Sequence, residues 1–294
     1  MPCGGYPTTG TPAGLPGGAV TTCYIGADGS GPSRAAIHWA LARSAGEGSP
    51  VVLIHVVDDE WGLLGAGYAV EAERRARELL DVELADAEHR YPGVEVVARI
   101  EHGSPAWTLA GLPSSGDLLV VGTHKTGFLH GRVLGSRSVQ VAAAARCTVA
   151  VVPDTTFDTR RGVVVGVDRF DGSAAAVVRG AREAARLGQE LLLVHAPPVS
   201  HVLPSADLPG STGAAQRLLV DAAEHAAQAA PLITVRRRLV HREPAEALLD
   251  AGNGASLLIL GVSHPHAMAQ PVIGSVTHDV LMNISVPVLI VRSD

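Results

Sequence analysis

Four glycines, with cationic and hydroxyl side chains between and after them, follow an apolar strand in the stretch VVGTHKTGFLHGRVLGSRSVQ, residues 120–140. Glycine allows a close approach of backbone to ligand and a positive φ angle. The serine after the last glycine opens a helical segment, and the unpaired N–H groups and dipole of a helix N-terminus favour an anion. The stretch therefore has the outline of a phosphate-binding loop. Its glycines are Gly122, Gly127, Gly131 and Gly135, and the serine is Ser136.

A second copy of this layout lies at residues 258–280, and other landmarks recur at the same interval. A Gly-x-Asp pair and a histidine that ends an apolar strand return after 140 residues, and the loop glycines return after 139. Landmarks in nearly constant register indicate a duplicated domain. The matched positions are Gly26 and Gly166, Asp28 and Asp168, His55 and His195, Gly122 and Gly261, Gly135 and Gly274, and Ser136 and Ser275.

The sequence predicts domains at 20–155 and 160–294, after a tail at 1–19 that is rich in Pro, Gly and Thr and is expected to be disordered. Apolar runs alternate with segments of helical periodicity in each domain. We therefore expect an α/β fold of two tandem, doubly wound, five-stranded parallel sheets of Rossmann-like form. In the first domain, strands are expected at 20–27, 50–57, 94–101, 117–122 and 147–153, and helices at 33–45, 70–90, 105–112 and 136–145. In the second domain, strands are expected at 162–167, 190–195, 233–240, 256–261 and 286–291, and helices at 172–187, 211–229, 244–251 and 275–282.

Two local features sharpen this scheme. The strand at 94–101 alternates polar and apolar residues and is expected near an edge, and a loop through Gly67 precedes the helix at 70–90. Ligands of doubly wound sheets bind beyond the carboxyl ends of the strands, where the strand order reverses. Asp28 follows the first strand and Gly122 ends the fourth, so we expect both to border one crevice.

These residues resemble the universal stress protein family, here in a tandem form. The resemblance rests on the aspartate after the first strand, the histidine that ends the second, and a glycine motif before the last helix. The family motif is glycine, two residues, glycine, nine residues, and then Gly-Ser or Gly-Thr. Both halves keep the spacing, but Lys125 and His264 replace the second glycine. The resemblance covers the chain from about Val20 to its end.

The resemblance implies that the protein binds an adenine nucleotide, ATP, with Mg²⁺ as its companion ion. It places the aspartate beside the adenosine, the backbone after the histidine beside the adenine, and the glycine motif around ribose and phosphates. The residues implied in the first domain are Gly26, Asp28, Val56, Gly122, His124, Lys125, Gly127, Arg132, Gly135, Ser136 and Arg137. Those in the second are Gly166, Asp168, Ala196, Gly261, His264, Gly274, Ser275 and Val276.

The replaced glycine leaves two alternatives for the phosphates. Lys125 either obstructs the approach of the backbone or supplies a cation. His264 supplies a cation only when protonated, which is a minority state of histidine at neutral pH. The second loop also contains Pro265 and Pro271, which remove N–H donors. We therefore expect the first domain to bind nucleotide more tightly than the second.

Each feature also has a purely structural explanation. The glycine loops could be tight connections that bind nothing, and Asp28 and Asp168 could cap the turns that follow them. For His55 and His195 we favour a structural role, a hydrogen bond to neighbouring backbone. His264 and a second histidine two residues later lack a third metal ligand in evident spacing, so we expect a surface loop and no metal site.

Composition and charge exclude several classes of protein. A net charge of −6 without a Lys/Arg block argues against nucleic acid or an anionic membrane as partner. No apolar stretch of membrane-spanning length and no signal-like start occur, so a cytoplasmic protein is expected.

Cys3, Cys23 and Cys147 are expected to be buried and unpaired. The charged segment 71–79 is expected to be a solvated helix face with ion pairs four residues apart.

The motifs GxSxG, GxxxxGK[ST] and HExxH are missing, and no GxGxxG follows the first strand. The missing motifs favour a non-enzymatic protein, and the resemblance implies an ATP-binding protein of the stress response, whose occupancy is expected to stabilise a conformation or assembly that other proteins recognise. The alternatives are a nucleotide-independent scaffold that dimerises through its fifth strands, and a slow ATPase. The two domains are expected to pair within the chain, and two chains to form a homodimer.

Overall fold

The structure is a computed structural model, and it describes residues 21–58, 66–123, 136–155, 159–168, 170–197, 211–262 and 273–292. The chain divides into two compact units. Of the described residues, unit 1 holds 21–58, 66–123 and 136–154, and unit 2 holds 155, 159–168, 170–197, 211–262 and 273–292. The predicted tail at 1–19 lies outside the described residues.

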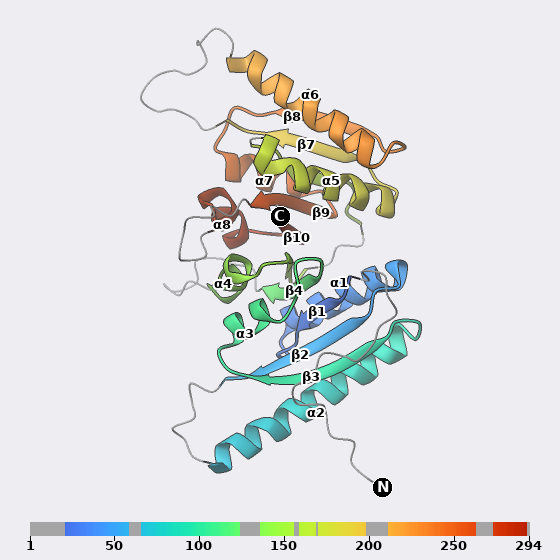
Figure 1. The fold of residues 1–294 in the computed structure, drawn as a ribbon, viewed down its shortest axis with the longest axis vertical. Helices are drawn as coiled ribbons and strands as arrows, with labels where there is room; N and C mark the ends of the chain where they lie inside the picture. Colours follow the sequence, from blue (N-terminus) through green and yellow to red (C-terminus); the bar gives the residue numbers. More distant parts are fainter. Residues whose placement is uncertain are drawn as a thin grey trace. The chain divides into compact units, whose positions relative to one another are not determined.

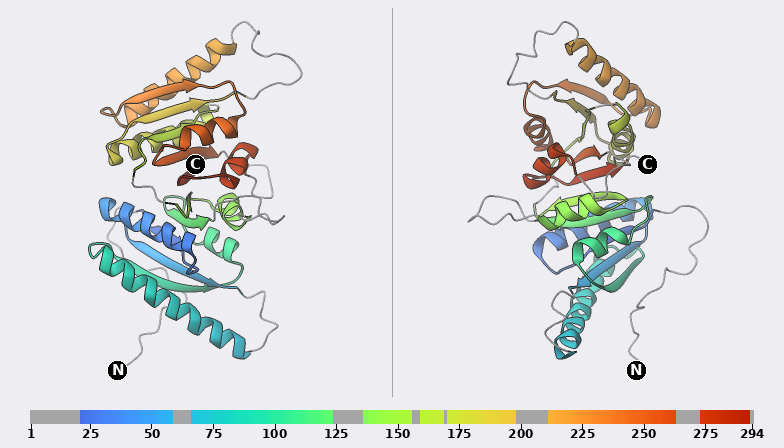
Figure 2. Two further views of the ribbon diagram at one scale, coloured as in Figure 1. Left: turned by 180° about the vertical axis from the view of Figure 1, so that it is seen from behind. Right: turned by 60° about the vertical axis from the view of Figure 1, so that its left-hand side comes forward.

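Unit 1 is a parallel sheet with the strand order β3-β2-β1-β4-β5 (Figure 1). In the central strand, Cys23 pairs with Val51 on one side and with Leu118 on the other. Helices α1 and α2 pack on one face, and α3 and α4 pack on the other (Figure 2). The elements are β1 Cys23–Gly26, α1 Gly31–Glu47, β2 Val51–Val57, α2 Ala66–Arg90, β3 Val96–His102, α3 Pro105–Gly111, β4 Leu118–Thr123, α4 Ser136–Ala144 and β5 Thr148–Pro153.

Helix α1 begins and ends where its sequence provides caps. The Ser30 side chain accepts a hydrogen bond from the N–H of Ser33 at 3.3 Å, and Pro32 lies in the first turn, where its missing N–H costs nothing. At the other end, Gly48 has a φ of 69°, and its N–H donates to the carbonyl of Ser44 at 2.8 Å. These caps extend the helix beyond the predicted 33–45 at both ends.

The predicted edge position of β3 is confirmed, and β2 is an inner strand. Residues 51–54 of β2 are all buried, because helices cover both faces of this inner strand. Strand β3 pairs only with β2 among the described residues and lies at the edge. The predicted start of α2 at residue 70 is wrong, since the helix begins at Ala66 and includes Gly67.

Unit 2 repeats this topology, with the strand order β8-β7-β6-β9-β10, all parallel. Helices α6 and α8 have the predicted bounds. The predicted fold class of two tandem, doubly wound, five-stranded sheets is confirmed. The elements are β6 Val163–Gly166, α5 Phe170–Leu187, β7 Leu191–His195, α6 Ser211–Ala229, β8 Val235–Leu239, α7 Pro244–Gly252, β9 Leu257–Val262, α8 Ser275–Met282 and β10 Val288–Arg292.

Candidate functional site

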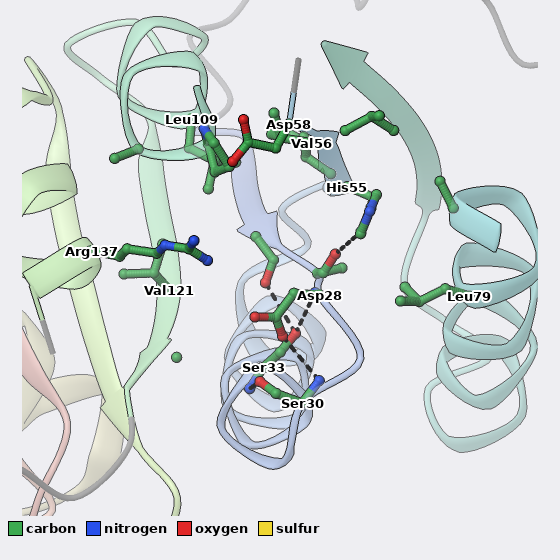
Figure 3. A pocket seen from close by; sticks show the side chains of 18 of the residues that line it. Asp28, Ser30, Ser33, His55, Val56, Asp58, Leu79, Leu109, Val121 and Arg137 are labelled. Atoms are coloured by element: carbon green, nitrogen blue, oxygen red, sulfur yellow. Dashed lines mark hydrogen bonds between the residues drawn. The ribbon is translucent and has the colours of Figure 1, made fainter. Parts of the chain in front are cut away.

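A cavity of about 560 Å³ lies at the carboxyl ends of the unit 1 strands (Figure 3). The neighbouring strands β1 and β4 send the chain to opposite faces, since α1 follows β1 and α4 follows β4. Doubly wound sheets bind their ligands at such a switch point. Asp28 and Gly122 both line the cavity, so they border one crevice as expected. Of the other residues predicted for the first domain, the cavity is lined by Gly26, Val56 and Arg137.

The rest of the predicted glycine motif cannot be placed in the site. Ser136 is the first residue of α4, directly before Arg137. The remaining residues predicted for the first domain lie outside the described residues: His124, Lys125, Gly127, Arg132 and Gly135. The choice between the two roles for Lys125 therefore stays a prediction.

Asp28 is held in a hydrogen-bonded turn at the edge of the cavity. Its Oδ1 accepts a hydrogen bond from the N–H of Ser30 at 2.9 Å, which is the capping interaction expected of an aspartate after a strand. Ser33 secures the same turn, because its hydroxyl accepts from the N–H of Asp28 at 3.1 Å and donates to the carbonyl of Gly26 at 3.2 Å. The turn presents the exposed Asp28 to the cavity (Figure 3).

His55 has the structural role that the sequence favoured. Its Nδ1 donates to the carbonyl oxygen of Ala27 at 2.7 Å, which ties the end of β2 to the loop after β1. Since a carbonyl only accepts, the proton of this bond is on Nδ1. The bond sets the position of Val56, the next residue of the cavity wall.

Packing explains why residue 122 is a glycine. A Cβ atom at Gly122 would lie 2.3 Å from the carbonyl oxygen of Pro32 and 2.7 Å from the nitrogen of Ser33. The first turn of α1 therefore rests directly on the backbone of β4. Gly26 is also closely packed, though less tightly, since its Cβ would lie 3.0 Å from the Leu109 side chain of α3. Neither glycine has a positive φ, so close approach is the physical reason for both.

The cations around the cavity differ in their partners. Arg75 is held by Glu71, with Nε 2.8 Å from Oε1. Hydrogen bonds from Arg74 and Arg75 lower the pKa of Glu71 to about 2. Arg137 is exposed at the start of α4, and it forms no ion pair or hydrogen bond with the described part of the chain. Its guanidinium is directed toward the cavity (Figure 3), so it is available to an anionic ligand.

The inner side of α2 forms a cavity wall that the sequence interpretation missed. The predicted ion pairs are confirmed on the outer side, for example between Arg77 and Glu73. Yet Ala72, Ala76 and Leu79 line the cavity. The available signal was the spacing of Ala76, Leu80, Leu84 and Ala87, which places them in one stripe along the helix. The sequence does not show that one end of this stripe faces a cavity. The other lining residues not predicted as site residues include Ser30, Ser33, Ile54, Asp58, Glu71, Arg75, Ala106, Leu109, Val121 and Val141.

Unit 2 keeps the framework of this site. The hydroxyl of Ser173 accepts a hydrogen bond from the N–H of Asp168 at 3.0 Å. His195 donates through Nδ1 to the carbonyl of Val167 at 2.6 Å, which confirms its structural role, and Ala196 follows it. Gly261 lies within β9, as Gly122 lies within β4.

Other positions of unit 2 differ in chemistry. Val276 takes the place of Arg137 as the second residue of the last helix. A Cβ at Gly166 would lie 3.0 Å from the Leu248 side chain and 3.1 Å from Leu260, which stands where unit 1 has a valine. Gly274 caps α8 with a φ of −62°, and Ser275 begins that helix. The second loop, with His264, lies outside the described residues.

Two tandem, doubly wound α/β domains with a cavity at the switch point of the first define the structural class. The chain belongs to the universal stress protein family, whose model matches residues 21–153 and 159–292. It is 28% identical to a universal stress protein of Mycolicibacterium smegmatis, over 91% of this chain and 96% of that protein. Universal stress protein Rv2005c of Mycobacterium tuberculosis is 27% identical, with the same coverage.

A solved structure shares the tandem fold. The crystal structure of a universal stress protein from Archaeoglobus fulgidus matches with a TM-score of 0.70 at 18% identity, over 93% of this chain and 99% of that chain.

Among the described residues, no group of three or more His, Cys, Asp or Glu is placed to hold a metal ion. The described helices include none that is long and apolar enough to cross a membrane. Cys23 and Cys147 are buried, as expected, and neither forms a disulfide within the described part of the chain, while Cys3 lies outside the described residues.

Proposed function

We propose that the unit 1 cavity binds an adenine nucleotide, ATP, and that the protein is a non-enzymatic cytoplasmic module of the stress response. One observation carries this proposal: Asp28 and Arg137 line the same cavity at the switch point of the sheet. A carboxylate suits the hydroxyl groups of a ribose, and a guanidinium suits phosphate oxygens. Ribose hydroxyls and phosphate oxygens are the polar groups at the two ends of a nucleotide's sugar-phosphate portion.

The remaining lining fits the rest of the ligand. A cavity of about 560 Å³ is within the usual range for a small-molecule site. The apolar side chains of Ile54, Ala76 and Leu109 offer a dry surface for an adenine ring, and the backbone after His55 offers it hydrogen bonds. Mg²⁺ bound with the triphosphate would neutralise part of its charge, and carboxylates and phosphates are its usual ligands.

A binding role is favoured over catalysis. His55, which lines the cavity, already donates its Nδ1–H to the carbonyl of Ala27. One oxygen of Asp28, Oδ1, likewise accepts a hydrogen bond from the N–H of Ser30. Together with the missing catalytic motifs, this supports a site that holds a nucleotide and responds to its presence. The predicted homodimer stays a prediction, and the mass of the protein in solution tests it.

Mass spectrometry of the small molecules released on denaturing the purified protein tests the proposal. We expect an adenine nucleotide, and added ATP should raise the melting temperature more than GTP does. Ligand at 100 times its Kd stabilises the folded state by about 2.7 kcal/mol. No bound nucleotide and an unchanged melting temperature at millimolar ATP would favour the scaffold. Phosphate release that depends on Asp28 would favour the slow ATPase.

A further inference from the structure

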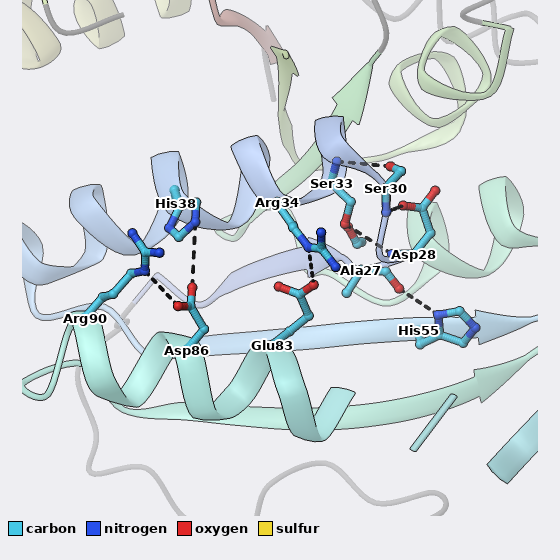
Figure 4. A network of polar contacts seen from close by, with 11 residues as sticks. Ala27, Asp28, Ser30, Ser33, Arg34, His38, His55, Glu83, Asp86 and Arg90 are labelled. Carbon is cyan, nitrogen blue, oxygen red and sulfur yellow. Dashed lines mark hydrogen bonds and ion pairs between the residues drawn. The ribbon is translucent and has the colours of Figure 1, made fainter. Parts of the chain in front are cut away.

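An ion pair between Arg34 and Glu83 links helices α1 and α2 (Figure 4). Both helices border the unit 1 cavity. The Nε of Arg34 lies 2.9 Å from Oε1 of Glu83. Glu83 is only 5% exposed, whereas the Arg34 side chain is 56% exposed. One turn along, Nε2 of His38 lies 3.7 Å from Oδ2 of Asp86. A buried carboxylate of α2 therefore depends on a cation that α1 supplies.

Unit 2 has an alanine where unit 1 has Arg34. Ser33 and Ser173 form the same hydrogen bond to the loop after the first strand of their unit, with the N–H of residues 28 and 168. These serines place Arg34 and Ala174 at the same position of their helices. The cationic partner is therefore absent at this position in unit 2.

Unit 2 also has an alanine where unit 1 has Glu83. The carbonyl of Ala87 accepts the hydrogen bond that ends α2, and the carbonyl of Ala226 accepts the same bond at the end of α6. Both alanines are buried. Counting back one turn from each gives Glu83 in unit 1 and Ala222 in unit 2, and Ala222 has no exposed surface. The ion pair of unit 1 is thus an alanine pair in unit 2.

The two helix pairs differ accordingly. In unit 2, α5 and α6 pack directly against each other. In the described part of unit 1, α1 and α2 have few backbone approaches and meet through long polar side chains, Arg34 against Glu83 and His38 against Asp86. The distance between packed helices depends on the size of the side chains between them. Alanines allow close contact, whereas an arginine and a glutamate hold two helices apart.

The position of α2 bears directly on the cavity. Leu79 lies one turn before Glu83 on the same side of the helix and lines the cavity. A Cβ at Gly29, in the loop after β1, would lie 2.9 Å from Cδ1 of Leu79. Ala76 and Ala72 continue the wall toward the start of the helix. Any shift of α2 toward α1 would therefore move this wall into the cavity.

We propose that the Arg34–Glu83 pair is a spacer that sets the separation of α1 and α2 and so keeps the unit 1 cavity open. Arg34 and Glu83 are then positioning residues, since neither lines the cavity. The ligand named in the test rests on the proposed function, but the spacing of the helices does not.

Three variants of the full chain test the spacer. Arg34→Ala leaves the buried Glu83 without its cation, and Arg34→Ala/Glu83→Ala copies the alanine pair of unit 2. Arg77→Ala is the matched control, because it breaks an exposed ion pair within α2 that does not reach α1. The measurements are the melting temperature, the Kd for ATP, and the distance between spin labels at Ala42→Cys and Ala85→Cys in a Cys3→Ser background. Both label positions are exposed on their helices.

We expect Arg34→Ala to lower the melting temperature by several degrees and to broaden the distance distribution. The double variant should recover the melting temperature but shorten the label distance, and its Kd for ATP should stay at least about tenfold weaker than that of the wild type. If the pair only stabilised the protein, the double variant would recover both the melting temperature and the affinity for ATP. The spacer is wrong if the double variant keeps the wild-type label distance or binds ATP as the wild type does. If the wild type binds no ATP, the proposed function fails, and the label distances still decide the spacer.

Discussion

His55 and Ala27 are joined by a hydrogen bond of 2.7 Å from the imidazole Nδ1 to the carbonyl oxygen. His195 makes the same bond to Val167 at 2.6 Å in unit 2. Each bond ties the end of the second strand to the loop after the first. In unit 1 this loop continues into Asp28, so the bond supports two walls of the cavity.

The two histidines form a matched pair of test positions. His55→Leu and His195→Leu should each lower the free energy of unfolding by about 1–3 kcal/mol, because a carbonyl loses its donor. Only His55→Leu should also weaken ATP binding, by roughly tenfold, since only unit 1 is proposed to bind. Chemical denaturation and titration calorimetry measure the two effects. Equal losses of affinity in both variants would contradict the assignment to unit 1.

Gly122 is a site position whose substitution should act through packing. Gly122→Ala should lower the free energy of unfolding by about 1–3 kcal/mol or prevent folding, because its Cβ would overlap the carbonyl of Pro32. Gly111→Ala is the control, since no atom lies within 4 Å of its added Cβ and alanine suits a helix better. Urea denaturation compares the two. A Gly122→Ala protein as stable as the wild type would contradict the packing explanation.

Arg137 should contact the phosphates of a bound nucleotide. Arg137→Ala should weaken ATP binding by about 10- to 100-fold, the value of a charge-assisted hydrogen bond, and should leave adenosine binding nearly unchanged. Calorimetry with both ligands separates a phosphate contact from a general disturbance. Arg146→Ala removes another exposed arginine of unit 1 and should bind ATP as the wild type does. An equal loss for adenosine and ATP would show that Arg137 does not act on phosphate.

One nucleotide should bind per chain. Unit 2 has Val276 in place of the cation and the larger Leu260 beside Gly166, so it offers less to a phosphate and less room to a ring. Native mass spectrometry of the full chain counts the bound molecules directly. The Arg137→Ala variant should lose most of this occupancy at limiting ATP, whereas two equivalent sites would leave half of it.

Cys23 should resist thiol reagents. Burial raises the pKa of its thiol to about 12, and the thiolate is the reactive form. Alkylation located by mass spectrometry should therefore be slow at pH 8 in the folded protein and fast in urea. Because the pKa is raised in the folded state, the thiol of the unfolded chain releases its proton at a lower pH than that of the folded protein. The contribution of Cys23 to stability should thus be present below pH of about 8.5 and fall as the pH rises toward 12.

The sequence alone determined the order and nature of the elements. Periods of two and 3.6 residues are local properties, so the strands, the helices and the edge position of β3 could be predicted. The repeated landmarks predicted the duplication and the histidine hydrogen bonds. Even the crevice between Asp28 and Gly122 followed, because strand topology fixes where carboxyl ends meet.

Only the tertiary structure decided which side chains share the cavity and why. The overlap at Gly122 involves Pro32, and the spacer joins Arg34 to Glu83, both pairs far apart in the chain. Such contacts depend on how closely two elements pack, which no local pattern specifies. For the same reason the inner wall of α2 escaped prediction: its stripe of small and apolar residues is that of any buried helix, and only the separation of α1 and α2 opens one end of it to a cavity.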